Sequence, residues 1–394
     1  MRIYYLIIGL FLFTLQKSLA QFPPLSSDAQ ISVLTIGPGE NLNDSFGHSA
    51  FRIKNGLEDI VFDYGRYDFD TPNFYLKFAQ GKLNYLMGKT NFDSFLYTYT
   101  YYNRTVKEQV LNLTFEEKQA FYNYLINNYN PENRAYLYDF FFDNCATKIR
   151  DVTNTALNKQ ITYNTPKSLQ EKTFRTLIQD NLDYNSWGSF GIDLALGSII
   201  DQKAKPYDYM FLPEYISMFF SEATKTNNIP LVANTRVLYE AKNNSETQLL
   251  TYVTGPFAVL GILSLIILFI TYNDYKQLKL TKSLDIIIFG LTGLIGVILL
   301  LLWFWTDHDM TAYNYNLLWA MPLNLVALIS ISLNRLSLKF QKYVMFLILM
   351  LVLMIFHWMV GVQRFAPSLF PLIIALFARF TYLFYYSKKR QLKS

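Results

Sequence analysis

Hydrophobic residues are distributed very unevenly along the chain. From residue 21 to about residue 245 they occur in short stretches, whereas the C-terminal part contains long apolar runs separated by short polar segments. These runs occupy residues 250–272, 284–305, 317–334, 342–361 and 369–386. Each approaches the ~20 residues with which an α-helix crosses a bilayer, so the pattern predicts five transmembrane helices. The third run is the weakest, because Pro322 and Asn324 interrupt it.

Basic residues predict how these helices are oriented. Lys and Arg are concentrated after the first and third runs and in the tail, whereas the segments after the second and fourth runs contain none or one. By the positive-inside rule the tail is cytoplasmic and residues 21–248 lie outside. The N-terminus agrees, because Met-Arg, an apolar run and Ser18-Leu19-Ala20 together predict a signal peptide cleaved after Ala20. An uncleaved anchor is the alternative, and either would export the domain that begins at residue 21.

The chain therefore divides into a signal peptide (1–20), an exported domain (21–248) and a membrane domain of five helices with a cytoplasmic tail (249–394). Of its 394 residues 52% are hydrophobic, and the formal net charge is +5. The basic residues lie largely in short segments between apolar runs, which fits membrane topology. A nucleic-acid-binding protein would need a basic stripe on a soluble face, so we expect no nucleic-acid partner.

The exported domain has the pattern of an α+β fold. Short β-rich stretches predict strands at Ile31–Ile36, Ala50–Ile53, Glu58–Tyr64, Val106–Leu113 and the aromatic Tyr136–Phe142. Thr114-Phe-Glu-Glu117 is a capping box that opens a helix to about Tyr129. Further helices are predicted over Ala146–Leu157 and the amphipathic Ser168–Asp180, and the Asn/Thr-rich residues 224–247 are predicted to be a loose connection.

Cys145 is the only cysteine of the chain, so it has no intramolecular disulfide partner. Asp143 and Asn144 are good N-cap residues, which places Cys145 in the first turn of the predicted helix. Free amide groups and the helix dipole favour a thiolate there, and the Cys145 N–H is a candidate oxyanion donor. The alternative is a small buried core residue, since most lone cysteines are of that kind.

His48 is one of three histidines and lies in Asp44-Ser-Phe-Gly-His-Ser-Ala-Phe-Arg52. Gly47 permits a tight turn or a close backbone approach directly before the imidazole. A histidine at the edge of a strand is well placed to activate a nearby thiol, although a single histidine is usually structural or solvent-exposed.

Several stretches match one known family. They are Phe46-Gly-His-Ser-Ala50, Phe62-Asp-Tyr-Gly65, Asn73-Phe-Tyr-Leu-Lys77 with Gly81-Lys-Leu83, Asp143-Asn-Cys145, Gly191-Ile-Asp-Leu194, and Thr306-Asp-His308 with Asn314-Tyr-Asn-Leu-Leu318 and Pro322. Over nearly its full length the chain resembles the Lnb family of Bacteroidetes, named for lipoprotein N-acylation in Bacteroides. The His-before-Cys order also resembles the permuted NlpC/P60-like, papain-type thiol enzymes, which include the lecithin:retinol acyltransferases.

The resemblance implies a permuted papain-like periplasmic domain that works in the inner membrane without a cofactor. Cys145 would be the nucleophile and His48 its base. The enzyme would move a fatty acyl chain from a phospholipid or a diacylglyceryl group to the α-amino group of a diacylglyceryl-modified lipoprotein. Asp63 lies where permuted relatives place the residue that orients the imidazole, with Asp44 and Ser45 as alternatives.

Substrate contacts are expected in two places. Near the thiol the candidates are Ser45 and Asn144, and in the outer loop 306–316 they are Asp307, His308 and Asn314. This loop lies between two membrane spans, where polar residues can bind a lipid head group, and a solvated loop is the alternative. His308 with Asp307 and Asp309 is only a weak metal pattern, so no metal is expected.

Two other functions fit the same sequence. A hydrolase of the same fold would cut peptidoglycan peptides or lipid esters with the same residues. A non-enzymatic membrane sensor or scaffold would keep the fold with an inert Cys145.

Overall fold

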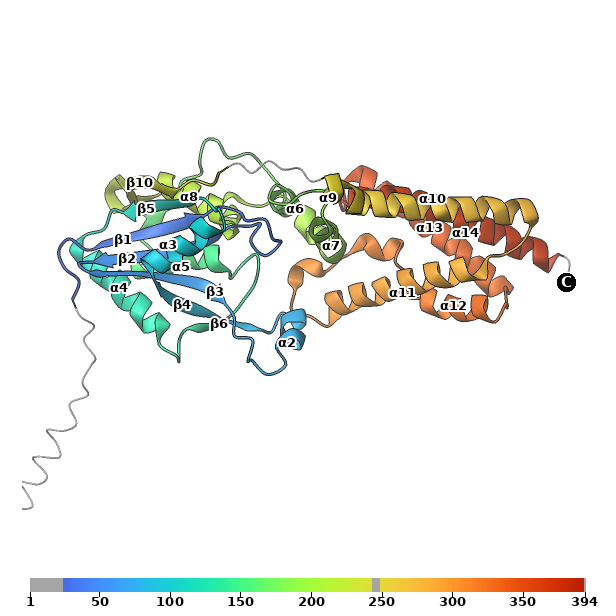
Figure 1. Ribbon diagram of the computed structural model, residues 1–394, viewed down its shortest axis with the longest axis horizontal. Helices are drawn as coiled ribbons and strands as arrows, with labels where there is room; N and C mark the ends of the chain where they lie inside the picture. The colour runs from blue at the N-terminus through green and yellow to red at the C-terminus, as the bar shows by residue number, and fades with distance from the viewer. Residues whose placement is uncertain (1–23, 243–248, 393–394) are drawn as a thin grey trace, which may run out of the picture.

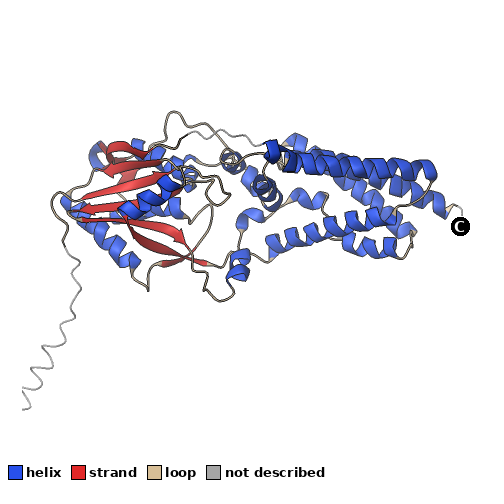
Figure 2. Cartoon of the chain, viewed as in Figure 1, coloured by secondary structure: helices blue, strands red, loops and turns tan. Residues whose placement is uncertain are grey.

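The computed structural model describes residues 24–242 and 249–392, so the expected signal peptide over residues 1–20 lies outside the described residues. A β-rich domain occupies one end of the molecule and long helices occupy the other (Figure 1). The strands are confined to the first domain (Figure 2). This division agrees with the hydrophobic pattern of the sequence.

The outer domain is built on a seven-stranded sheet of order β10-β5-β1-β2-β3-β4-β6. All its neighbouring strands are antiparallel. The strands are β1 (Gln30–Ile36), β2 (His48–Asn55), β3 (Glu58–Arg66), β4 (Asn84–Asn91), β5 (Val106–Leu111), β6 (Ala135–Leu137) and β10 (Val232–Tyr239). A small second sheet joins β7 (Ile161–Thr162), β8 (Thr224–Lys225) and β9 (Ile229–Pro230).

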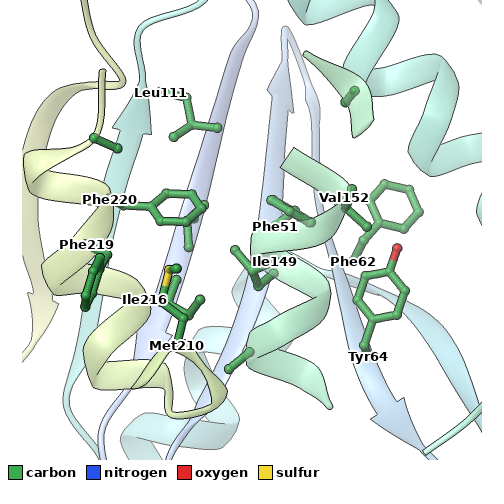
Figure 3. Packing of buried hydrophobic residues seen from close by; sticks show 14 of the residues in the cluster. Phe51, Phe62, Tyr64, Leu111, Ile149, Val152, Met210, Ile216, Phe219 and Phe220 are labelled. Carbon is green, nitrogen blue, oxygen red and sulfur yellow. The ribbon is translucent and has the colours of Figure 1, made fainter. Parts of the chain in front are cut away.

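Helices cover both faces of the large sheet, which confirms the α+β prediction. One face carries α3 (Phe92–Tyr101), whose Phe92 and Phe95 pack on Ala50 and Val61. The opposite face carries α4 (Phe115–Tyr129), α5 (Cys145–Ala156) and α8 (Pro213–Glu222). Figure 3 shows Phe51 and Phe62 beside Ile149 and Val152 of α5, and Phe220 of α8 near Leu111 of β5.

Three local predictions differ from the structure. The predicted aromatic strand ends at Leu137, because the Asp139 carboxylate accepts hydrogen bonds from the Phe141 and Phe142 amides and turns the chain. Within residues 168–180 only α6 (Phe174–Gln179) is helical. The predicted loose connection contains β10, which pairs with β5 at the edge of the sheet, while residues 243–248 lie outside the described residues.

The membrane domain contains four helices long and apolar enough to cross a bilayer, counted over residues 24–242 and 249–392. They are α10 (Pro256–Gln277), α11 (Lys282–Phe304), α13 (Leu338–Val360) and α14 (Phe370–Gln391), preceded by the short α9 (Leu249–Thr254). The predicted third span instead forms a 3-10 turn, η5 (Tyr315–Leu318), and α12 (Asn324–Ser332), a helix of nine residues. Since a helix rises about 1.5 Å per residue, α12 alone is too short to cross.

The broken third run is supported by contacts with its neighbours. Asn324 donates to the Thr292 hydroxyl at 2.7 Å and accepts from the Tyr343 hydroxyl at 2.6 Å, so its amide is satisfied inside the bundle. A Cβ on Gly296 of α11 would lie 2.1 Å from the Ala320 carbonyl oxygen, so glycine allows the irregular segment to approach. Non-helical backbone is tolerated at membrane depth when it is buried in protein in this way.

Candidate active site

His48 is the first residue of β2, and the turn before it depends on Gly47. Gly47 has φ +78, and a Cβ at this position would lie 2.6 Å from the Ile36 carbonyl oxygen, so another residue would be strained and would clash. In the β1–β2 register His48 lies opposite Ile36, at the end of the sheet. Its side chain is on the α3 face, with its ring centroid 6.2 Å from that of Tyr99.

Asp63 is the acidic residue that contacts the imidazole. Ala50 pairs with Asp63 across β2 and β3, so His48, two residues before Ala50, is a diagonal neighbour on the same face. The Asp63 Oδ2 atom lies 3.2 Å from His48 Nε2, and Arg66 Nη2 lies 2.7 Å from Asp63 Oδ1.

The two alternatives to Asp63 are engaged elsewhere. The Asp44 carboxylate pairs with Arg104 at 3.1 Å, and the Ser45 hydroxyl donates to the Asn41 carbonyl oxygen at 2.9 Å.

Cys145 is the first residue of α5, where Asn144 caps the helix. The Asn144 side-chain oxygen accepts from the Ala146 and Thr147 amides at 2.8 and 2.9 Å. Its nitrogen donates to the carbonyl oxygens of Phe140 and Phe211, the latter ending the 3-10 helix η2 (Pro206–Phe211). A first-turn amide has no acceptor within the helix, so the Cys145 N–H makes no hydrogen bond within α5.

Gly65 is the point where α5 approaches the histidine. The helix packs on the face of the sheet opposite α3, but the β3–β4 pairing shifts register between Asp63 and Arg66. Gly65 lies within this irregular stretch with φ +97, and a Cβ on it would lie 3.7 Å from Cys145 Cβ. The irregularity brings the start of α5 to the His48 end of the sheet, where Cys145 is within hydrogen-bonding reach of His48.

The surroundings of the histidine favour its charged form. Burial alone lowers the pKa of His48, but Tyr99, Cys145 and the hydrogen bonds to Asp63 and Cys145 outweigh it and raise the pKa well above 6.5. Burial likewise opposes the charge of Asp63, yet His48 and Arg66 lower the pKa of this carboxyl below 3.8. A protonated imidazole between a carboxylate and a sulfur is therefore favoured.

The structure adds neighbours that the sequence pattern did not single out. Burial and the proximity of Cys145 raise the pKa of Tyr138 well above 10.0, so this phenol stays neutral beside the sulfur. Arg66 holds Asp63, and Tyr99 reaches the imidazole from α3. Arg66 and Tyr99 reach the site through the register shift in β3 and the docking of α3, and neither feature is encoded in a local motif.

Two candidate residues of the outer loop, Asn314 and Asp307, contact segments other than the His48–Asp63 pair. Asn314 is 1% exposed and donates to the carbonyl oxygens of Leu194 and Ala195, at the end of α7 (Trp187–Ala195). Asp307 is exposed and pairs loosely with Lys82 at 3.9 Å. Over residues 24–242 and 249–392 no three His, Cys, Asp or Glu side chains gather closely enough to hold a metal.

An apolar cavity of about 430 Å³ lies between the two domains, beside the thiol site. Phe46 and Phe140 line it, and their ring centroids are 4.9 Å apart. Phe46 precedes His48 by two residues, and the Phe140 carbonyl accepts from the Asn144 cap. Residues of α7 and of the outer loop, including His308, complete the lining.

Two family models match the chain, one to each domain. The Lnb N-terminal periplasmic domain matches residues 25–180, and the Lnb transmembrane domain matches residues 246–391. The chain belongs to the Lnb family. This Lnb protein is a membrane protein with a periplasmic domain, and its family membership points to lipoprotein N-acylation. No curated protein and no solved structure matches the chain.

Proposed function

We propose that this Lnb protein is a lipoprotein N-acyltransferase of the inner membrane, with a periplasmic catalytic domain (21–248) of permuted papain type. The observation that carries the proposal is the imidazole of His48, which lies 3.2 Å from Asp63 and close enough to Cys145 for this residue to raise its pKa. Because Asp63 engages Nε2, we assign the proton exchange with the sulfur to Nδ1. This arrangement supports the roles of nucleophile for Cys145, base for His48 and orienting residue for Asp63.

In the first half-reaction the Cys145 thiolate attacks an ester carbonyl of a phospholipid or of a diacylglyceryl group. A carbon–sulfur bond forms, and the resulting oxyanion accepts a hydrogen bond from the Cys145 N–H. The intermediate collapses by breaking the carbon–oxygen bond of the ester. The His48 imidazolium gives its proton to the departing alkoxide, so the products are a thioester on Cys145, neutral His48 and a lipid alcohol.

In the second half-reaction the free α-amino group of the lipid-modified cysteine of a lipoprotein attacks the thioester. A carbon–nitrogen bond forms and the carbon–sulfur bond breaks, which releases the thiolate. Neutral His48 takes the proton that the amine loses, so the imidazolium and the thiolate are both restored. The product is an N-acylated lipoprotein.

The enclosure of the site favours transfer over hydrolysis. The His48 side chain is 18% exposed, Asp63 is 8% exposed, and the neighbouring cavity is lined mainly by apolar residues. Limited access of water protects a thioester. Four long membrane helices hold the domain at the bilayer, where both lipid-bearing substrates are located.

A test in cells replaces the only gene copy with Cys145→Ala or Cys145→Ser. Intact-mass analysis of a lipoprotein should then show a free N-terminal amine in both strains, with membrane levels of the variants equal to wild type by immunoblot. Unchanged N-acylation in the Cys145→Ala strain would overturn the proposal.

A test with purified enzyme separates transfer from hydrolysis. The full chain in detergent is incubated with labelled phospholipid, with and without a lipid-modified acceptor peptide carrying a free amine. Acyl transfer predicts an acyl adduct on Cys145 that is discharged by the acceptor. Release of free fatty acid at the same rate with or without acceptor would identify a lipid hydrolase, and digestion of sacculi would identify a peptidase.

A further inference from the structure

The cavity between the two domains has an apolar interior with polar groups that are either satisfied or at its edge. The Asp139 carboxylate is occupied by two backbone amides, and the Thr311 hydroxyl donates to the Leu302 and His308 carbonyl oxygens. Asp309 is solvent-exposed and His308 is half-buried. An occupant with an apolar body would therefore leave no buried polar group without a partner.

Hydrogen bonds also join the wall of the cavity that α7 forms to the outer surface of the membrane domain. Asn316 donates to the carbonyl oxygens of Asp193 and Leu194, and Asn314 donates to those of Leu194 and Ala195. These bonds fix the end of α7 to the start of η5, in the outer loop that follows α11. The cavity thus lies at the outer surface of the membrane domain. Cys145 and His48 are not among its lining residues, but Phe46 lies two positions before His48 and Phe141 lies four positions before Cys145.

We propose that this cavity holds the fatty acyl chain carried by Cys145 and that its size sets the length of the chain transferred. This inference rests on the proposed acyltransferase function. The volume of about 430 Å³ is within the ~300–1,000 Å³ typical of pockets that enclose small ligands. A peptide segment fits less well, because its backbone groups would find few partners on the apolar walls.

Gly191 is an exposed lining position at which a Cβ can be added without a clash. It lines the cavity from α7, and a Cβ added there would have no heavy atom within 4 Å. Gly188, on the preceding turn, is different, because a Cβ there would lie 2.8 Å from Leu42 Cδ1. An alanine at a helix-interior glycine also stabilises the helix by ~1 kcal/mol, so substitution at Gly191 should preserve folding.

The experiment is a graded series, Gly191→Ala, Gly191→Leu and Gly191→Phe, in the full-length protein. Each variant is the only copy in cells, and the N-acyl chains of a lipoprotein are measured by mass spectrometry. The chain-length distribution should shift toward shorter chains as the side chain grows. Each methylene that no longer fits should lower transfer by ~10-fold or more. Gly261→Phe is the matched control, because Gly261 also has open space around its Cβ but lies on α10.

A second measurement covers a variant that acylates too little to be profiled in cells. The purified protein is exposed to dioctanoyl or dipalmitoyl phosphatidylethanolamine, and the adduct on Cys145 is quantified by intact mass. Gly191→Phe should lose the long-chain adduct and keep the short-chain adduct. Equal loss of both adducts, or an unchanged chain-length distribution in cells, would overturn the chain-length inference. If wild type forms no adduct with either lipid, that result contradicts the proposed function itself and not only the chain-length inference.

Discussion

Asp63 and His48 lie on neighbouring strands, and their side chains meet at 3.2 Å on the α3 face of the sheet. The carboxylate fixes the imidazole through Nε2 and stabilises its charged form. We predict that Asp63→Asn lowers the rate of Cys145 acylation by ~10²–10⁴-fold. Because the carboxylate raises the pKa of His48, its loss should also move the alkaline limit of activity to lower pH.

Alkylation provides the measurement, because Cys145 is the only thiol of the chain. The rate of iodoacetamide labelling is followed against pH for wild type and Asp63→Asn, alongside adduct formation with phospholipid. Asp44→Asn is the matched control, because Asp44 pairs with Arg104 and not with the imidazole. Identical pH profiles for Asp63→Asn and wild type would show that the carboxylate does not act on His48.

The raised pKa of His48 also predicts how stability depends on pH. A group whose pKa is higher in the folded than in the unfolded state stabilises the fold below its unfolded pKa, here about 6.5. That contribution is lost as the pH rises through the folded value. The thermal stability of wild type relative to His48→Gln, measured in detergent, should therefore be greatest below pH ~6.5 and decline in alkaline buffer. A stability difference that grows with pH would contradict the raised pKa.

Local signals in the sequence were sufficient to predict where two helices begin, α4 and the site helix α5. The Thr114 capping box is complete, with the Thr114 side chain accepting from the Glu117 amide and the Glu117 side chain accepting from the Thr114 amide. The N-cap at Asn144 correctly placed Cys145 at the start of a helix. These features depend on neighbours within a few residues, so they can be read from the sequence.

Features that depend on distant contacts could not be predicted in the same way. The third apolar run forms only a short helix because Asn324 finds partners on α11 and α13, and hydropathy does not describe such contacts. Asn314 matched a family motif, but its role in joining α7 to the outer loop appears only when residues far apart in sequence are brought together. The register shift at Gly65 is equally non-local, since it arises from pairing with β4.

Asn144 offers a test of how the helix cap supports the nucleophile. Asn144→Ala removes the cap, at a cost of ~0.5–2 kcal/mol. It also leaves the Phe211 carbonyl without this donor in a buried position, at ~1–3 kcal/mol more. We predict lower thermal stability and slower alkylation of Cys145, because the first turn of α5 loosens.

Thr114→Ala is the control for the Asn144 prediction. It removes a capping-box side chain at the start of α4, a helix other than the one that begins with Cys145. It should reduce stability by ~1 kcal/mol and leave the alkylation rate unchanged. If both variants slow alkylation equally, the Asn144 cap has no particular role at Cys145.

Arg379 of α14 is fully buried between two carboxylates of the membrane domain. Its guanidinium contacts Asp285 through Nε and Nη2, both at 2.7 Å, and contacts Asp274 through Nη1 at 2.9 Å. All three side chains are 0% exposed. Since removing one partner leaves an uncompensated buried charge, Arg379→Met should destabilise the protein by ~3–5 kcal/mol. The measurement is thermal unfolding of the full chain in detergent, together with its level in membranes.

Two further variants decide whether unpaired charge is the cause. Arg390→Met changes an exposed arginine of the same helix, which donates to Asn334, and should cost less than ~1 kcal/mol. Combining Arg379→Met with Asp274→Asn and Asp285→Asn removes the two carboxylates that Arg379→Met leaves unpaired. Most of the lost stability should therefore return. A triple variant as unstable as Arg379→Met alone would mean that Arg379 stabilises α10, α11 and α14 through packing and not through its charge.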